Sequence, residues 1–169
     1  RQQLDTTVVG VTGSVGKTST KDLISAACSA ERKTTANERS FNNEQGLPIT
    51  ILNAPDDTEV LILEMGMRGF GEITSLCEVA RPNIGVVTAV GYSHTERVGG
   101  IDGVAKAKQE LVAALPKSGT AILNADDERV AAMAKHTGAS VLTYGTAGGD
   151  ICISNLVLDE LARPSFRVD

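Results

Sequence analysis

Residues 6–18 read TTVVGVTGSVGKT, and this stretch decides the fold. Its first part, 6–9, is a β-branched run typical of a buried strand. Residues 10–18 carry glycines at every third position and end in Gly-Lys-Thr. Residues 19–30 then place apolar side chains at helical spacing. Strand, glycine-rich loop and helix in this order are the context that a phosphate-binding loop requires.

The residues of this loop are candidates for nucleotide contact. Backbone N–H groups at a helix start point toward an anion, and the helix dipole reinforces them. Lys17 would reach the β- and γ-phosphates, and the Thr18 hydroxyl would hold Mg²⁺. The usual pattern has a glycine where this chain has Val11, so a tight strand-to-helix turn is the alternative. The predicted phosphate-binding residues are Gly13, Ser14, Val15, Gly16, Lys17, Thr18 and Ser19.

Apolar strands alternate with helices through most of the chain, which predicts a parallel sheet covered on both faces. We expect an α/β fold of the P-loop NTPase type, a mostly parallel sheet flanked by helices, with a β-hairpin tail. The expected strands are 6–9, 33–36, 58–63, 83–90, 120–123 and 140–144, and the tail strands are 152–158 and 165–168. The expected helices are 19–30, 46–53, 71–80, 101–115 and 128–136.

Polar residues gather where the predicted strands end. Glu64, His94, Asn124 and Asp127 each follow such a strand, and ligands of parallel sheets bind at that edge. Glu64 is a candidate Mg²⁺ ligand, with helix capping as its alternative. His94 fits either a cation or phosphate site or an ordinary surface position. Asn124 and Asp127 fit a helix cap.

Other residues have ordinary interpretations when the pattern is considered alone. Asn42 and Asn43 are typical turn formers. Lys106 and Lys108 look like solvated charges on a helix. Nothing in their spacing favours one lysine over the other.

Composition excludes several classes of protein. The 169 residues suffice for one domain with a core, and the net charge of −5 shows no basic surface for nucleic acid. Aromatic residues make up 3%, which disfavours base stacking. No apolar run is long enough for a membrane span. The cysteines (Cys28, Cys77, Cys152) are odd in number and widely spaced, as expected of reduced thiols in the cytoplasm.

Five stretches together resemble the central, ATP-binding domain of the Mur ligases, and among these the branch that adds D-alanyl-D-alanine. The loop TGSVGKT matches the TGxxGKT/S form of that family, which accounts for Val11. The other stretches are FNNEQGLP (41–48), EMGMRGFGEI (64–73), SHTERVGGIDGVAKAKQEL (93–111) and AILNADD (121–127). The combination is far more specific than the phosphate loop alone.

The resemblance implies a role for each matching residue. Lys17 and Thr18 match the triphosphate and magnesium residues, and Glu64 matches the acidic ligand. His94 matches the histidine at a second Mg²⁺. Lys108 matches a lysine that is often carbamylated, so that CO₂ converts the amine into a carboxylate-like metal ligand. Asn42 and Asn43 match asparagines that line the site near the γ-phosphate. The resemblance also implies nucleotide contacts at Asn124 and Asp127.

The resemblance further implies an activity and its partners. Family members use ATP and Mg²⁺ to form an acyl phosphate, and in this branch they join D-Ala-D-Ala to UDP-MurNAc-tripeptide for peptidoglycan. They have three domains, so we expect residues 1–169 to be a central domain, truncated at its carboxyl end and inactive alone. We also expect a cytoplasmic monomer.

Two alternatives remain open from the sequence. One is another Mur-type or folylpolyglutamate-type ligase, against which FNNEQGLP argues. The other is an NTPase or nucleotide-binding module that forms no amide bond. Ser93, Thr95 and Val98 also depart from the family's usual residues around His94.

Overall fold

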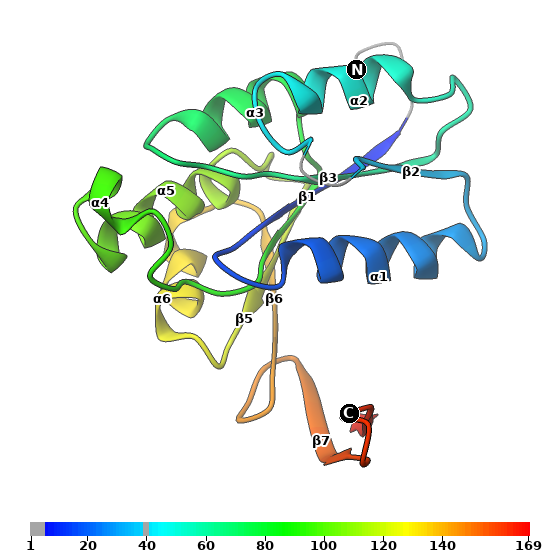
Figure 1. Cartoon of the computed structure of the whole chain (residues 1–169), viewed down its shortest axis with the longest axis vertical. Coiled ribbons are helices and arrows are strands. Elements are labelled where there is room, and N and C mark those ends of the chain that lie inside the picture. The colour runs from blue at the N-terminus through cyan, green and yellow to red at the C-terminus, as the bar shows by residue number, and fades with distance from the viewer. Residues whose placement is uncertain (1–5, 39–40) are drawn as a thin grey trace.

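A computed structural model describes residues 6–38 and 41–169, and the polar lead-in predicted at residues 1–5 lies outside them. Strands and helices alternate as predicted (Figure 1). The strands are β1 (Thr7–Thr12), β2 (Thr34–Ala36), β3 (Val60–Glu64), β4 (Ile84–Val87), β5 (Thr120–Asn124), β6 (Ser140–Gly145), β7 (Ile151–Leu158) and β8 (Pro164–Val168). The helices are α1 (Lys17–Ser29), α2 (Gly46–Asn53), α3 (Glu72–Ala80), α4 (Thr95–Val98), α5 (Ile101–Ala113) and α6 (Glu128–Ala131), and a 3₁₀ helix follows at Ala132–His136.

The strands form one sheet in the order β2-β3-β1-β4-β5-β6-β7-β8. All neighbouring pairs are parallel except β7 and β8, which are antiparallel. The expected fold class is therefore confirmed. Because β1 lies between β3 and β4, the loop after β1 is flanked by the carboxyl ends of both neighbours.

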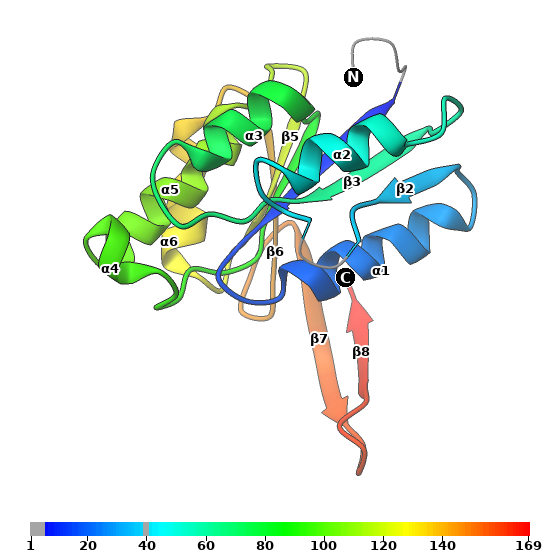
Figure 2. The ribbon, with the colours of Figure 1, turned by 45° about the horizontal axis from the view of Figure 1, so that its top comes forward.

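Alternation along the strands divides the core between the two faces of the sheet. Val8, Leu61 and Leu63 face α2, α3 and α5, whereas Val9 and Ile62 face α1. Figure 2 shows α1 on one side of the sheet and α2 and α3 on the other. Each strand near the centre is thus covered on both faces, as its continuous apolar sequence requires.

Several predicted boundaries shift. The strand β1 runs on to Thr12, so Gly10 lies in the sheet and not in the loop. A Cβ at Gly10 would lie 2.9 Å from Leu111 Cδ1 of α5, so the glycine lets that helix pack closely. The strand β4 ends at Val87, earlier than predicted, and the short helix α4 was not expected.

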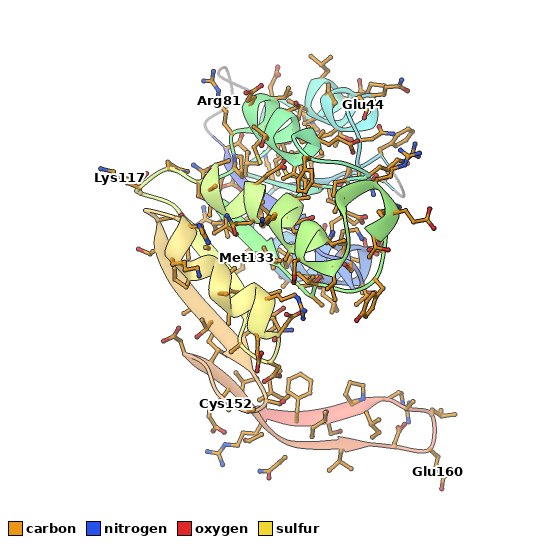
Figure 3. All side chains as sticks on the ribbon, turned by 90° about the vertical axis from the view of Figure 1, so that its left-hand side faces the viewer. Glu44, Arg81, Lys117, Met133, Cys152 and Glu160 are labelled. Atoms are coloured by element: carbon orange, nitrogen blue, oxygen red, sulfur yellow. The ribbon has the colours of Figure 1, made fainter. Side chains whose placement is uncertain are left out.

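The hairpin β7–β8 extends away from the rest of the fold, from Cys152 toward Glu160 (Figure 3). The register pairs Ile153 with Val168, and Ser154 with Arg167. By alternation, Phe166 and Val168 share one apolar face, which is exposed. The predicted hairpin is therefore present, and one face of it is hydrophobic.

Candidate functional site: a phosphate-binding cleft

The phosphate loop, residues 13–16, lies between β1 and α1 and is hydrogen-bonded to the loop that follows β4. Gly16 adopts φ 79° and precedes the first turn of α1, where a glycine can take this left-handed conformation. The Thr88 hydroxyl donates to the Val15 carbonyl at 2.6 Å, and Lys17 Nζ donates to the Gly13 carbonyl at 2.8 Å. These contacts fix the loop with its lysine lying across it.

Ser14 makes the second connection between the same two loops. Its backbone N–H donates to the Ala89 carbonyl at 2.7 Å. Its Oγ accepts from the Gly91 N–H at 2.8 Å and donates to the Gly91 carbonyl at 3.2 Å. The segment leading to His94 is therefore bonded directly to the phosphate loop.

Glu64 ends β3 beside the phosphate loop, and 3% of it is exposed. Its Oε2 accepts from the Thr18 hydroxyl at 2.7 Å, and its Oε1 accepts from Asn42 Nδ2 at 2.8 Å. Both partners are neutral, and within the described residues no ion pair neutralises this carboxylate. Buried charges are normally paired or bound to a metal. A buried carboxylate without a cationic partner, next to the Thr18 hydroxyl, therefore suits Mg²⁺, which prefers oxygen ligands.

A cleft of about 440 Å³ opens at this edge of the sheet. It brings together seven of the predicted site residues: Gly13, Ser14, Lys17, Asn42, Asn43, His94 and Lys108. Thr18 and Glu64 adjoin it through Asn42 and the phosphate loop. Residues from four separate segments of the chain thus converge on one cavity.

Lys108 is distinguished from Lys106 by its surroundings. It is 3% exposed and lines the cleft, whereas Lys106 is exposed on α5. Burial, reinforced by the charge of Lys17, lowers the pKa of Lys108 from its usual value to about 8. A large fraction of this amine is therefore neutral near pH 8, and the interpretation as a solvated helix charge is wrong.

His94 reaches the same cleft from a strained backbone position. Its φ of 59° lies in the left-handed region, which is uncommon for residues other than glycine. It immediately precedes α4, and Gly99 and Gly100 with positive φ follow that helix. Strain of this kind persists where the surrounding structure holds it, often at functional sites.

Asn43 also has a local structural role beside the cleft. Its Oδ1 accepts from the N–H groups of Gln45 and Gly46 at the start of α2. The turn-forming interpretation of Asn43 therefore holds in the structure, and its side chain still lines the cleft.

Asn124 and Asp127 lie behind the site and do not line the cleft. Asn124 Nδ2 donates to the Thr88 carbonyl, and Asp127 Oδ2 accepts from the Val90 N–H. Asp127 also caps α6, as its helix-capping interpretation predicts. Both residues support the loop after β4, and a nucleotide contact by either remains a prediction.

Val15 and Ser19, the remaining predicted residues of the loop, do not line the cleft. Val15 has an exposed side chain, and Ser19 lies in the first turn of α1. Arg68 and Arg97 also line the cleft, although neither is a predicted site residue. Arg68 lies four residues after the end of β3 in the motif EMGMRGFGEI, and Arg97 lies three residues after His94 in the motif that begins SHTERV. Their places in these two motifs are the sequence signal that points to them.

Within residues 6–38 and 41–169, no three His, Cys, Asp or Glu side chains gather into a metal-binding group. Mg²⁺ is commonly held by one or two carboxylates together with substrate phosphates, so this finding agrees with the arrangement around Glu64. In the same residues, none of the helices has the length and apolar character to cross a bilayer.

Comparison with known proteins identifies the family. The family model described as the Mur ligase middle domain matches residues 11–164. The chain belongs to this family. The Mur ligase middle domain so identified contains the phosphate loop, the cleft and most of the hairpin.

The two relatives described next, from different bacteria, have the same name. The chain is 48% identical to UDP-N-acetylmuramoyl-tripeptide--D-alanyl-D-alanine ligase of Mycobacterium tuberculosis, over 96% of the chain and 32% of that protein. It is 40% identical to the enzyme of the same name from Synechocystis, over 97% of the chain and 37% of that protein. The chain thus spans about a third of the length of these relatives.

Solved structures agree with this assignment. MurF from Acinetobacter baumannii superimposes with a TM-score of 0.93 at 26% identity, over 99% of the chain and 37% of that structure. MurF ligase from Thermotoga maritima, in complex with ADP, gives 0.87 at 31% identity, over 94% of the chain and 37% of that structure. The Mur ligase middle domain fold is therefore shared over nearly the whole chain.

Proposed function

We propose that this domain supplies the Mg-ATP site of a ligase that joins D-Ala-D-Ala to UDP-MurNAc-tripeptide. The observation that carries the proposal is the convergence of the phosphate loop, Asn42, His94 and Lys108 on one cleft. The relatives that bear this name support the choice of substrates. We place the proposed activity in peptidoglycan precursor synthesis in the cytoplasm.

The first step of the proposed reaction brings two anions together. The carboxylate of the acceptor peptide attacks the γ-phosphorus of ATP, forming a C–O–P linkage and releasing ADP. The N–H groups of the phosphate loop and the ammonium of Lys17 bind the phosphate oxygens and offset their charge. Arg68 and Arg97 add positive charge to the wall of the same cleft.

The second step forms the amide bond. The amine of D-Ala-D-Ala attacks the acyl phosphate, and the tetrahedral intermediate collapses with loss of inorganic phosphate and a proton. The chain need supply no covalent nucleophile, because the acyl phosphate is already activated. Its residues hold the reacting groups in place and stabilise negative charge, which are the main contributions in phosphoryl transfer.

Thr18 and Glu64 are the residues that would hold Mg²⁺, and His94 and carbamylated Lys108 would serve a second ion. Bound Mg²⁺ supplies Lewis-acid stabilisation of the phosphate charge. The lowered pKa of Lys108 supports carbamylation, because a neutral amine attacks CO₂ and an ammonium does not. A carbamate on Lys108 would lie in the same cleft as Lys17, whose positive charge would stabilise it.

Product analysis tests this proposal. The full-length protein that carries this domain is incubated with Mg-ATP, UDP-MurNAc-tripeptide and D-Ala-D-Ala, and mass spectrometry looks for the pentapeptide product and ADP. We expect amide product only when D-Ala-D-Ala is present. ADP without amide product across a panel of amino acids and precursors would favour a plain NTPase.

The phosphate loop gives a direct test of nucleotide binding. Lys17→Ala removes a charged donor to phosphate, so we expect nucleotide affinity to fall roughly 10- to 100-fold. Titration with a fluorescent ADP analogue measures the change. Lys106→Ala is the matched control, since Lys106 is an exposed lysine outside the cleft. Unchanged affinity in Lys17→Ala would remove the phosphate-loop assignment.

A further inference from the structure

Lys21 is a buried lysine that the proposed reaction does not use. It lies on α1, one helical turn beyond Thr18, and is 4% exposed. Its Nζ donates to the Asn37 carbonyl at 2.8 Å and lies 3.0 Å from Asp22, whose side chain is largely in solvent. Burying an ammonium group costs free energy even when it is bonded. An apolar side chain would cover the same surface more cheaply, so packing alone does not explain a lysine here.

Asn37 connects Lys21 to the carboxyl end of β3. It follows β2 and is 1% exposed. Its Oδ1 accepts from the Glu64 N–H at 2.8 Å, and its Nδ2 donates to the Phe41 carbonyl at 2.9 Å and to the Glu64 carbonyl at 3.4 Å. One asparagine side chain thus holds both backbone groups of Glu64.

These contacts close into a ring that includes the magnesium-site residues. Thr18 and Lys21 stand one turn apart on α1, where side chains share a face. Thr18 bonds to the Glu64 carboxylate, Glu64 bonds through its backbone to Asn37, and Asn37 bonds to Lys21. The helix α1 therefore contacts Glu64 in two ways. Thr18 bonds directly to its side chain, and Lys21 acts on its backbone through Asn37.

We propose that Lys21 is a positioning residue for the carboxylate of Glu64 and acts through Asn37. The inference rests on the proposed function, because Glu64 is a metal ligand only in that proposal. Partners that orient a metal ligand typically contribute 10- to 100-fold to metal affinity. Since Lys21 acts through one intervening residue, we expect an effect of about tenfold.

The test measures how much Mg²⁺ nucleotide binding requires. In the full-length protein that carries this domain, binding of a fluorescent ADP analogue is titrated at a series of Mg²⁺ concentrations. Lys21→Met keeps an unbranched side chain but loses the donor. We expect its half-maximal Mg²⁺ concentration to rise about tenfold, with wild-type ADP affinity at saturating Mg²⁺. Glu64→Gln, which changes the ligand itself, is the positive control.

Two matched variants separate this effect from ordinary destabilisation. Asp22→Asn removes the ion pair but leaves the bond from Lys21 to Asn37, so its Mg²⁺ requirement should equal that of wild type. Ile24→Ala weakens the packing of α1 on the sheet without touching Asn37. All variants are compared well below their own unfolding temperatures, and Lys21→Leu, which also lacks a donor, replaces Lys21→Met if the latter does not fold.

The outcomes distinguish the positioning role of Lys21 from the proposed magnesium site. If the Mg²⁺ requirement of the Lys21 variant matches that of wild type or of Ile24→Ala, the positioning role is overturned and the metal site stands. If the wild-type protein itself binds ADP without any dependence on Mg²⁺, the proposed magnesium site is overturned first.

Discussion

At the scale of single residues, two lysines separated by one position on α5 have opposite surroundings. Lys106 is exposed, whereas Lys108 is buried at the cleft and has a lowered pKa of about 8. A helical step of two residues turns a side chain by more than half a circle, so only one of the two can face the site. The sequence predicts both lysines on the same helix, and the packing of that helix decides which of them is buried at the cleft.

Lys108 should therefore be essential to activity and Lys106 dispensable. In the full-length protein, we expect Lys108→Ala to lower the rate of amide formation by at least about 100-fold, because loss of a residue that only orients a metal ligand already costs about 10- to 100-fold. Lys106→Ala is the matched control and should retain the wild-type rate. Short carboxylic acids should partly restore Lys108→Ala by replacing the carbamate. Rate assays with added acetate check this, and the opposite ranking of the two lysines would contradict the assignment.

Cys77 should be the least reactive of the three thiols. Burial on α3, together with the charge of Glu110, raises the pKa of Cys77 to about 12, while Cys28 and Cys152 are partly exposed. Because the thiolate is the nucleophile, we expect native Cys77 to be alkylated at least about tenfold more slowly than the others at pH 8. Mass spectrometry after timed iodoacetamide treatment measures the rates. Denatured protein is the control, and equal labelling in the native state would disprove the prediction.

At the residue scale, sequence motifs located side chains that line the cleft, whereas hydrogen bonds between distant segments left no pattern in the sequence. Asn124 and Asp127 carry polar groups at the correct edge of the sheet, yet they bond to the loop after β4. Lys21 and Asn37 gave no signal, because only the folded chain brings α1, β2 and β3 together. Short-range spacing does not contain that information.

At the scale of elements, the phosphate loop depends on close contact with the residue after β4. A Cβ at Gly13 would lie 1.9 Å from the Thr88 hydroxyl oxygen, and Gly13 has φ +154°. At Gly16 the nearest such atom is 3.9 Å away, although φ is +79°. Gly13 therefore serves both space and backbone conformation, whereas Gly16 serves backbone conformation alone.

Substitution of these glycines should reveal the difference. We expect Gly13→Ala to displace the loop from Thr88 and abolish measurable nucleotide binding. Gly16→Ala has room for its methyl group and should cost only the roughly 1–2 kcal/mol of a left-handed alanine. Chemical denaturation and ADP titration measure both variants. Equal loss of nucleotide binding in the two would mean that the contact with Thr88 is unimportant.

Element boundaries show where periodicity reaches its limit as a predictor. The helix at Gly46–Asn53 was placed correctly, because Pro48 is tolerated in a first turn. The helix α4 was missed because its residues, Thr95–Val98, are too few to show a period. The predicted strand 83–90 was too long, since Val90 leaves the sheet to bond with Asp127.

At the scale of the whole molecule, Lys108 links stability to pH. Its folded pKa of about 8 lies below the usual value of 10.5, so the unfolded chain binds more protons between these values. The cost of burying the charge is complete below pH 8 and fades as pH rises toward 10.5. Cys77 acts in the opposite direction above its usual pKa of 9.0, because only the unfolded thiol ionises there.

Comparison with Lys108→Met isolates this contribution. In CO₂-free buffer, we expect the variant to be more stable than wild type at pH 7 by about 3 kcal/mol, a figure that follows from the size of the pKa shift. The advantage should shrink steadily between pH 8 and 10.5. Urea denaturation of both proteins at a series of pH values measures the difference, from which the contribution of Cys77 cancels. A difference that does not change with pH would contradict the lowered pKa.

The pair of hydrogen bonds between Ser14 and Gly91 has a consequence for the order of events during turnover. Because the segment before His94 is hydrogen-bonded to the phosphate loop, a movement of either segment is expected to displace the other. Two ligands that each hold this joined unit in one arrangement favour each other's binding, and the free energy of that coupling is reciprocal. We therefore expect a compound that binds on the His94 side of the cleft to tighten nucleotide binding without contacting the nucleotide.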